Sequence, residues 1–336
     1  MISSKSEEQL LLRWLFGEII YQQHKGVPTN KPEKWSWATI TRFQKILFST
    51  LEQHDLPATR SWYMWGGYIH SDIFEREKFN YFRKRYSTNP DKVLRLREGV
   101  KKFGISIDDI IESVNKISDK VLSMRSKDYI PLYYKHESPL EYRDLYVSKQ
   151  NITDYYDLFS SYTPYRNYEH FSIIEDDFQQ NLYLFNLFGS NLLDNVDLNQ
   201  TSYKFNNIVG ITLDKSKVVL LLEESMPNII FSFFKRIDTF FKEYIWKPYA
   251  CEVSQNTVKG LRADEERRLM VEKEVNSIHF GKEKIDELYA LLKRNKLEPS
   301  YDDYKILEDR SDVDPKIRNL VDNMLKIYTK KDDEID

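Results

Sequence analysis

The amino-acid sequence predicts a mostly α-helical protein of two helical domains, each with room for a small β-hairpin. Scarce glycine, apolar residues at helical spacing along most of the chain, and the composition of a folded protein together predict this class. The 336 residues include 10 glycines, 41% hydrophobic residues and 31% charged residues. Because tight turns and phosphate-binding loops depend on glycine, its scarcity argues against a Rossmann sheet, a P-loop enzyme and a β-sandwich. A chain of this length usually forms more than one domain.

The first expected domain covers residues 1–125 and is helical and basic. Its second helix shows the clearest pattern, because an apolar residue recurs at Ile40, Phe43, Leu47 and Leu51, on one helical face. Similar patterns, together with capping and turn residues, predict helices at 4–23, 36–54, 71–85, 89–104 and 107–124. The aromatic segment 59–68 breaks the helical pattern and ends in Gly66-Gly67. We expect a short extended segment and a tight turn there.

A junction and a second, acidic domain follow. Residues 126–165 are rich in tyrosine and broken by Pro131, Pro139 and Pro164, so we expect short helices between the domains. The second domain covers residues 166–330, with helices expected at 168–188, 227–251, 262–278, 282–293 and 315–330, and a tail covers 331–336. Residues 208–223 fit either a hairpin with its turn at 214–216 or the start of a helix.

Charge is divided unevenly along the chain. Residues 1–102 hold 18 Lys and Arg against 11 Asp and Glu, a net charge of +7, and since the whole chain carries −3, the remainder carries −10. The positive excess gathers in the segment 76–102, whose candidate binding residues are Arg76, Lys78, Arg83, Lys84, Arg85, Arg95, Arg97, Lys101 and Lys102. Aromatic residues are interleaved at 79–86. Three interpretations stay open: the solvated face of two helices, a surface for an acidic protein, or a surface that binds phosphates and stacks on bases.

No sequence motif identifies a catalytic residue, a metal site or a cofactor site. The six histidines lack metal-binding spacing, and the Walker A, G-x-G-x-x-G and G-x-S-x-G patterns are absent. The single cysteine, Cys251, excludes a disulfide within the chain. The acidic runs 175–177 and 302–303 come nearest to a metal-binding pattern, and 301–305 has the acid–lysine composition of restriction-type nucleases. We favour a non-enzymatic protein without cofactors and keep a divergent metal-dependent nuclease as an alternative.

Two short stretches carry a resemblance to a known family. The first is Lys45-Ile46-Leu47-Phe48, within 40–48, and the second is Trp65-Gly66-Gly67-Tyr68, within 62–68. Over residues 7–125 this order resembles the Panacea antitoxin domain. In that family a lysine–hydrophobic–hydrophobic–tyrosine helix precedes an aromatic turn containing Tyr-Gly-Pro and then another helix. Gly67 stands where the family usually has proline.

The resemblance implies a helical binding module that neutralises a toxin by direct contact, often encoded near mobile elements or defence systems. It supplies no catalytic residues. It implies a structural role for its signature, which consists of Trp62, Trp65, Gly66, Gly67 and Tyr68. The acidic second part of the chain has no counterpart in that family.

The remaining patterns predict a cytoplasmic protein with no membrane partner. The first eight residues are polar, and the apolar stretch 10–21 is interrupted by Arg13 and Glu18, so we expect no secretory signal. The longest aliphatic run, 218–222, is too short to span a membrane. We therefore expect an antitoxin-like or antiviral-defence regulator that binds a protein partner. A nucleic-acid-binding protein that uses residues 76–102 is the first alternative.

Overall fold

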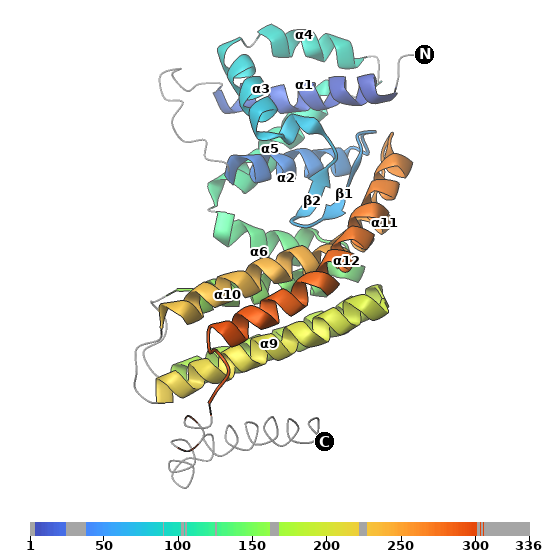
Figure 1. The fold of residues 1–336 in the computed structure, drawn as a ribbon. Helices are drawn as coiled ribbons and strands as arrows, with labels where there is room; N and C mark the ends of the chain where they lie inside the picture. Colours follow the sequence, from blue (N-terminus) through green and yellow to red (C-terminus); the bar gives the residue numbers. More distant parts are fainter. Residues whose placement is uncertain are drawn as a thin grey trace. The chain divides into compact units, whose positions relative to one another are not determined.

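The computed structural model describes residues 4–24, 38–89, 91–101, 104, 106–124, 126–161, 168–221, 227–300, 303 and 305. Over these residues the protein is mostly α-helical, as predicted, and its strands form one two-stranded hairpin (Figure 1). None of the described helices is long and apolar enough to cross a membrane.

The chain divides into two compact units. Unit 1 comprises Met1–Val147 and Tyr249–Glu274, and unit 2 comprises Ser148–Pro248 and Val275–Asp336. The boundary after Val147 lies within the predicted junction. Residues 249–274, which we expected in the second domain, return to unit 1, where the backbone of Lys259 exchanges two hydrogen bonds with that of Arg60.

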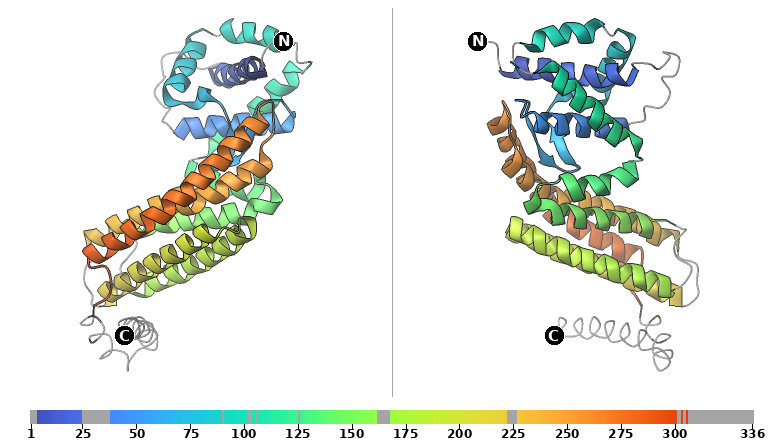
Figure 2. Two further views of the ribbon diagram at one scale, coloured as in Figure 1. Left: turned by 45° about the vertical axis from the view of Figure 1, so that its right-hand side comes forward. Right: turned by 180° about the vertical axis from the view of Figure 1, so that it is seen from behind.

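Unit 1 combines helices with the hairpin. In chain order its elements are α1 (Ser4–His24), α2 (Ala38–Gln53), β1 (Arg60–Tyr63), β2 (Gly66–Ile69), the 3-10 turn η1 (Asp72–Phe74), α3 (Arg76–Thr88), α4 (Asp91–Val100), α5 (Ile107–Ser123), α6 (Ser126–Glu137), the 3-10 turn η3 (Leu140–Tyr142), the start of α7 (Arg143–Phe159), most of α11 (Lys247–Thr257) and the start of α12 (Ala263–Arg294). Helix α1 packs against α3, α4 and α5, and α2 packs against α5 and β2 (Figure 2).

The core of unit 1 is aromatic at the contact of α1, α2 and α3. The Phe16 and Phe79 rings lie 5.2 Å apart at 85°, and Phe43 meets Phe79 at 5.4 Å and 87°. All three side chains are at most 2% exposed. Edge-to-face pairs of this kind add to the free energy of burial, so the apolar stripes predicted for these helices form the core.

Two predicted features of unit 1 differ from the structure. The expected helix 71–85 is broken: Ser71 caps the short turn η1, and α3 begins only at Arg76, because Glu75 has an extended backbone (φ −60°, ψ 136°). The expected turn at Gly66-Gly67 is wrong as well. The turn is made by Met64 and Trp65, and the two glycines open β2.

Unit 2 is built from long helices. It contains the rest of α7, α8 (Tyr168–Leu192), α9 (Val196–Leu221), α10 (Asn228–Phe240), the π-helical turn η4 (Phe241–Trp246), the first two residues of α11 and the second part of α12. Helices α8, α9 and α10 run lengthwise beside one another (Figure 2). Stacked phenylalanine rings join α10 to its neighbours, with 5.0 Å between Phe159 of α7 and Phe234, and 5.5 Å between Phe205 of α9 and Phe240.

The hairpin alternative for residues 208–223 is wrong over its described part. Residues 208–221 continue α9, and 222–226 lie outside the described residues. Buried Ile208, Leu213 and Ser216 keep the helical period, and Asp214 pairs with Lys217 along the helix at 2.8 Å instead of forming a turn.

Two helices predicted near the end of the chain form one. Residues 262–278 and 282–293 are joined in α12, which runs through Gly281. A Cβ at Gly281 would lie 3.1 Å from Cβ of Tyr244, so this glycine lets α12 pack closely against η4 and does not end the helix. The helix expected at 315–330 lies outside the described residues.

Candidate functional site

The hairpin of unit 1 depends on both glycines of the signature. Strands β1 and β2 pair antiparallel, with Tyr63 opposite Gly66. Gly66 has φ +86°, which favours glycine, and a Cβ on Gly67 would lie 2.4 Å from the ring of Phe48. The same close approach excludes the proline that is usual at this place in the resembling family.

A buried lysine fastens this hairpin to α2. The ammonium of Lys45, a residue only 1% exposed, donates to the carbonyl oxygens of Gly67 at 3.0 Å and of Trp65. It also lies 4.9 Å from the ring centroid of Tyr133. The two stretches that carry the family resemblance therefore meet through Lys45.

The tryptophans of the signature differ in exposure. Trp62 is 5% exposed and stacks on Tyr133, with 5.3 Å between ring centroids. Trp65 at the turn is 46% exposed, while Tyr68 is half-buried beside His70. Trp62, Gly66 and Gly67 are therefore packed inside unit 1, whereas Trp65 is exposed at the turn.

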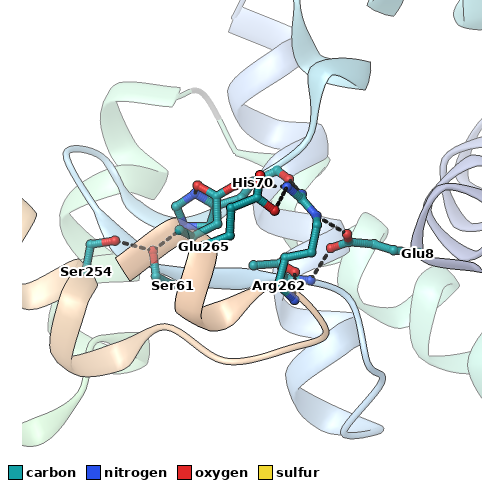
Figure 3. Close-up of polar contacts among 8 residues, drawn as sticks. Glu8, Ser61, His70, Ser254, Arg262 and Glu265 are labelled. Carbon is teal, nitrogen blue, oxygen red and sulfur yellow. Dashed lines mark hydrogen bonds and ion pairs between the residues drawn. The ribbon is translucent and has the colours of Figure 1, made fainter. Parts of the chain in front are cut away.

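A network of buried polar side chains connects the hairpin to residues of α11 and α12 in unit 1 (Figure 3). Ser61 Oγ on β1 is 2.7 Å from Nε2 of His70, and Nδ1 of His70 is 3.0 Å from Oε2 of Glu266 on α12. Ser254 Oγ on α11 is 2.7 Å from Ser61 Oγ. Sequence reasoning missed this set, because its members are up to 205 positions apart and show no local motif.

Arg262 completes the network at its other end. Its Nε donates to Glu8 Oε2 at 2.6 Å, Nη1 to Glu266 Oε1 at 3.0 Å, and Nη2 to the carbonyl oxygen of His70 at 2.5 Å (Figure 3). Burial alone lowers the pKa of Arg262, but the bond to Glu8 and the charges of both glutamates outweigh it and raise that pKa. For Glu266, burial alone would raise the pKa of the carboxyl. The hydrogen bond to His70 and the charges of His70 and Arg262 outweigh burial, so that the pKa is lowered.

The backbone brings Arg262 to this position. The turn between α11 and α12 runs beside β1, where Leu261 N donates to Pro57 O at 3.1 Å and Arg262 N donates to Thr59 Oγ1 at 3.0 Å. Gly260 has φ +113°, and a Cβ there would lie 2.5 Å from the oxygen of Ala58. The turn therefore requires glycine at 260.

The arrangement of Ser61, His70 and Glu266 has the order of a nucleophile, a base and an acid. Ser61 is 1% exposed and His70 is 5% exposed, however, and Ser61 does not line the neighbouring cleft of about 510 Å³. A nucleophile must reach its substrate, whereas the buried Ser61 hydroxyl is hydrogen-bonded to Ser254 as well as to His70. We interpret these polar side chains as a structural network that holds the unit 1 parts of α11 and α12 against the hairpin.

The cleft itself takes mixed charges from several elements of unit 1. His70 and Glu266 border it, together with Lys5, Asp72 and Lys273. Tyr68 also lines it, and burial, followed by the charges of Glu266 and Glu75, raises the pKa of its phenol.

Three candidate cations of the basic segment 76–102 are held in ion pairs. Lys78 pairs with Asp72 at 2.7 Å, Arg97 with buried Glu18 at 2.6 Å, and Lys101 with Glu98 at 2.6 Å. Of the other candidate binding residues, the exposed ones are Arg76, Lys84, Arg85 and Arg95, while Arg83 is half-exposed. Lys102 lies outside the described residues.

Over the described part of the chain, no three His, Cys, Asp or Glu side chains are grouped to hold a metal ion. In the two acidic runs, Glu175 pairs with Lys217 at 3.0 Å and Asp303 pairs with Lys215 at 2.6 Å. Asp302 lies outside the described residues, and Cys251 is buried.

Unit 2 also buries a lysine that the sequence analysis did not identify. Lys149 on α7 is 0% exposed, and its Nζ lies 5.9 Å from the ring centroid of Trp246. Burial and the charge of Lys242 lower the pKa of Lys149 to about 7, against the opposing charges of Asp238 and Asp154. A signal was present, since residue 149 falls on the face of α7 that buries residues 145, 152 and 156.

Comparison with known proteins finds a family similar to part of this chain. A family model described as a domain of unknown function (DUF8098) matches residues 217–326, about a third of the chain. No curated protein and no solved structure matches. The matched range extends from α9 through α12 and contains Arg262 and Glu266, so this chain is similar to that family over the helices that supply part of the polar network.

Proposed function

We propose that this chain is a non-enzymatic, antitoxin-like or defence-associated regulator that binds a protein partner through unit 1. One observation carries the proposal: Lys45 of the first resembling stretch donates hydrogen bonds to the carbonyls of Trp65 and Gly67 in the second. The residues that suggest the antitoxin family thus act together in the fold. The buried Ser61 and the dispersed carboxylates favour binding over catalysis in the described part of the chain.

A growth assay tests the proposal. The product of the gene beside the one for this chain is expressed alone and together with the chain, and growth and co-purification are measured. We expect arrest by the neighbour's product alone, and rescue with a stable complex when the chain is present. The matched variants are Lys45→Met, which weakens the hairpin attachment and the rescue, and exposed Lys116→Met on α5, which leaves rescue unchanged.

Two results contradict the proposal. One is rescue that fails, or that occurs without a complex between the two proteins. The other is metal-dependent cleavage of nucleic acid by the purified chain, abolished by substitution of an acidic residue, which would restore the nuclease alternative.

A nucleic-acid-binding role is the second candidate, and a specific observation favours it. Tyr81 on α3 is 56% exposed next to Arg85, whose Nη1 donates to the Tyr81 hydroxyl at 2.8 Å. An exposed ring beside an arginine can stack on an unpaired base. Fluorescence anisotropy with a single-stranded oligonucleotide over a salt series tests this role. It fails if binding is absent at low salt or unchanged when Arg83, Lys84 and Arg85 are together replaced by alanine.

A further inference from the structure

A pocket of about 360 Å³ lies between α1, η1 and α3 of unit 1. Its floor is formed by the apolar side chains of Leu12 and Ile73, which are 1% and 3% exposed. Tyr81 and Phe82 form one wall. A volume of this size falls in the range of ligand-binding pockets, and the lining suits an aliphatic or aromatic side chain. The pocket is separate from the buried polar network.

Two arginines flank the aromatic wall. The guanidinium carbon of Arg13 lies 5.3 Å from the ring centroid of Phe82, and that of Arg85 lies 5.8 Å from the ring centroid of Tyr81. Burial raises the pKa of Tyr86, and the charges of Arg85 and Arg13 both oppose that rise, so both cations act on the same group of rings. Neither arginine forms an ion pair with a carboxylate of the described residues, which leaves two cations available to a ligand.

The carboxylates of the lining select between classes of ligand. The pocket is also lined by Asp72, already paired with Lys78, and by exposed Glu77. Evenly spaced phosphates would meet these carboxylates as well as the arginines, and like charges brought together cost affinity. A peptide can place carboxylates only beside the arginines and an apolar side chain over the floor, so the charges favour a protein segment.

We propose that this pocket binds an acidic segment of a protein partner. An apolar side chain of that segment enters between Leu12 and Phe82, and neighbouring carboxylates contact Arg13 and Arg85. The inference rests on the proposed function, since it names the surface of unit 1 and the chemistry of the partner. Residues 1–102 carry a net charge of +7, and the pocket is the place where an acidic partner would contact this part of the chain.

A selection experiment tests the pocket with a defined probe. The full chain is immobilised and a displayed library of random short peptides is selected on it, with a single-stranded oligonucleotide as a separate competitor. We expect enriched peptides to combine Asp or Glu with Leu or an aromatic residue. Their affinity is expected to fall at least about tenfold in Arg13→Glu and Arg85→Glu, because a repelling charge replaces each cation.

Matched variants keep the test interpretable. Tyr81→Ala removes an exposed ring of the pocket and should weaken the same peptides without unfolding the protein, whereas Arg268→Glu, exposed on α12 and outside the pocket lining, should not. The proposal is overturned if no such peptides are enriched, if Arg268→Glu weakens them as much as Arg13→Glu, or if the oligonucleotide displaces them by binding at these arginines.

The growth assay separates this inference from the proposed function. If the chain rescues growth and the double variant Arg13→Glu, Arg85→Glu rescues equally, the function stands and the pocket is wrong. If the chain fails to rescue but acidic, apolar peptides still bind in a manner that needs Arg13 and Arg85, the pocket stands and the regulator function is wrong.

Discussion

Each unit buries a lysine, and the two lysines differ in what surrounds the ammonium group. Lys45 in unit 1 and Lys149 in unit 2 are at most 1% exposed. The hydrogen bonds of Lys45 reach two backbone carbonyls of the hairpin. Around Lys149, the charge of Lys242 adds to the effect of burial and lowers the pKa to about 7. Equal burial therefore has opposite expected consequences, because the surrounding groups decide whether a buried charge stabilises the fold.

Arg262 extends this contrast beyond lysine. Its guanidinium has acceptors on Glu8, Glu266 and the His70 carbonyl, which join α1, α12 and the end of the hairpin. Arg262 therefore connects several elements of unit 1 through its hydrogen bonds. We therefore expect its loss to have the largest effect among the substitutions below.

The substitution Arg262→Met should lower the free energy of unfolding by about 3–5 kcal/mol, because it leaves the buried Glu8 and Glu266 carboxylates without their cation. Urea unfolding followed by circular dichroism measures the change. Arg267→Met is the matched control on the same helix, since Arg267 is 47% exposed and pairs with exposed Asp264. Equal effects of the two substitutions would break the comparison.

Lys45→Met should lower the free energy of unfolding by about 3 kcal/mol, because the carbonyls of Trp65 and Gly67 lose a donor in a buried place. Hydrogen exchange at the amides of β1 and β2 should quicken more than exchange in α8, which reports on unit 2. The contrast between the two buried lysines would be wrong if Lys45→Met were neutral, as we expect of exposed Lys84→Met.

Lys149→Met should instead stabilise the protein, by about 2 kcal/mol at pH 6, because methionine removes the cost of burying a charge while Asp238 keeps its 2.6 Å pair with Lys242. The folded pKa of Lys149, about 7, lies below the ordinary value of 10.5, so the unfolded chain binds more protons between these values. Wild-type stability at this site therefore rises from pH 7 to pH 10.5, and the advantage of the variant shrinks over the same window.

Thermal unfolding at several pH values measures this advantage, with exposed Lys235→Met of α10 as the control. A variant that is less stable than the wild type at every pH would contradict the prediction. It would mean that Lys149 makes contacts that outweigh the cost of its burial.

The sequence predicted those parts of the fold that depend on neighbouring residues. Helix α2 was predicted because Phe43, Leu47 and Leu51 share a helical face, and these three are fully buried. The segment 208–223 stayed ambiguous because 214–216 resembles a turn locally. In the folded chain residues 208–221 are helical, and Lys215 and Lys217 pair with distant Asp303 and Glu175. Local pattern thus sets the helices, and ambiguity arises where tertiary packing overrides it.

The candidate site was less predictable, for a physical reason. The resemblance selected Lys45 and the glycines because they lie close together in the sequence. Ser61 meets Ser254 only after the chain has passed through unit 2 and returned, and no spacing rule connects residues 193 positions apart. Composition likewise could not show that Arg97 of the basic segment pairs with buried Glu18, because the two residues lie on different helices.

The smallest expected effect concerns Glu274, a half-buried carboxylate of unit 1 that burial disfavours. Burial raises the pKa of Glu274 on α12 to about 7, and Glu252 on α11 adds to that rise while Gln255 opposes it. Since this value exceeds the ordinary 4.5, the folded chain binds more protons between pH 4.5 and 7, and stability falls as the pH rises through that window. Glu274→Gln should therefore stabilise the protein at pH 8 by about 1 kcal/mol, allowing for solvent screening of a half-buried group.

Urea unfolding at pH 5 and pH 8 measures this effect, with exposed Glu272→Gln as the control on the same helix. We expect Glu274→Gln to gain at pH 8 and to change little at pH 5, where the glutamate is already protonated in the folded chain. A gain that is equal at both pH values would show that the glutamine amide, not the removed charge, stabilises the pair of helices. A gain confined to pH 8 would show that unit 1, like unit 2, contains a buried charge that destabilises the fold. The difference between Lys45 and Lys149 would then come from the groups around each lysine and not from the unit that contains it.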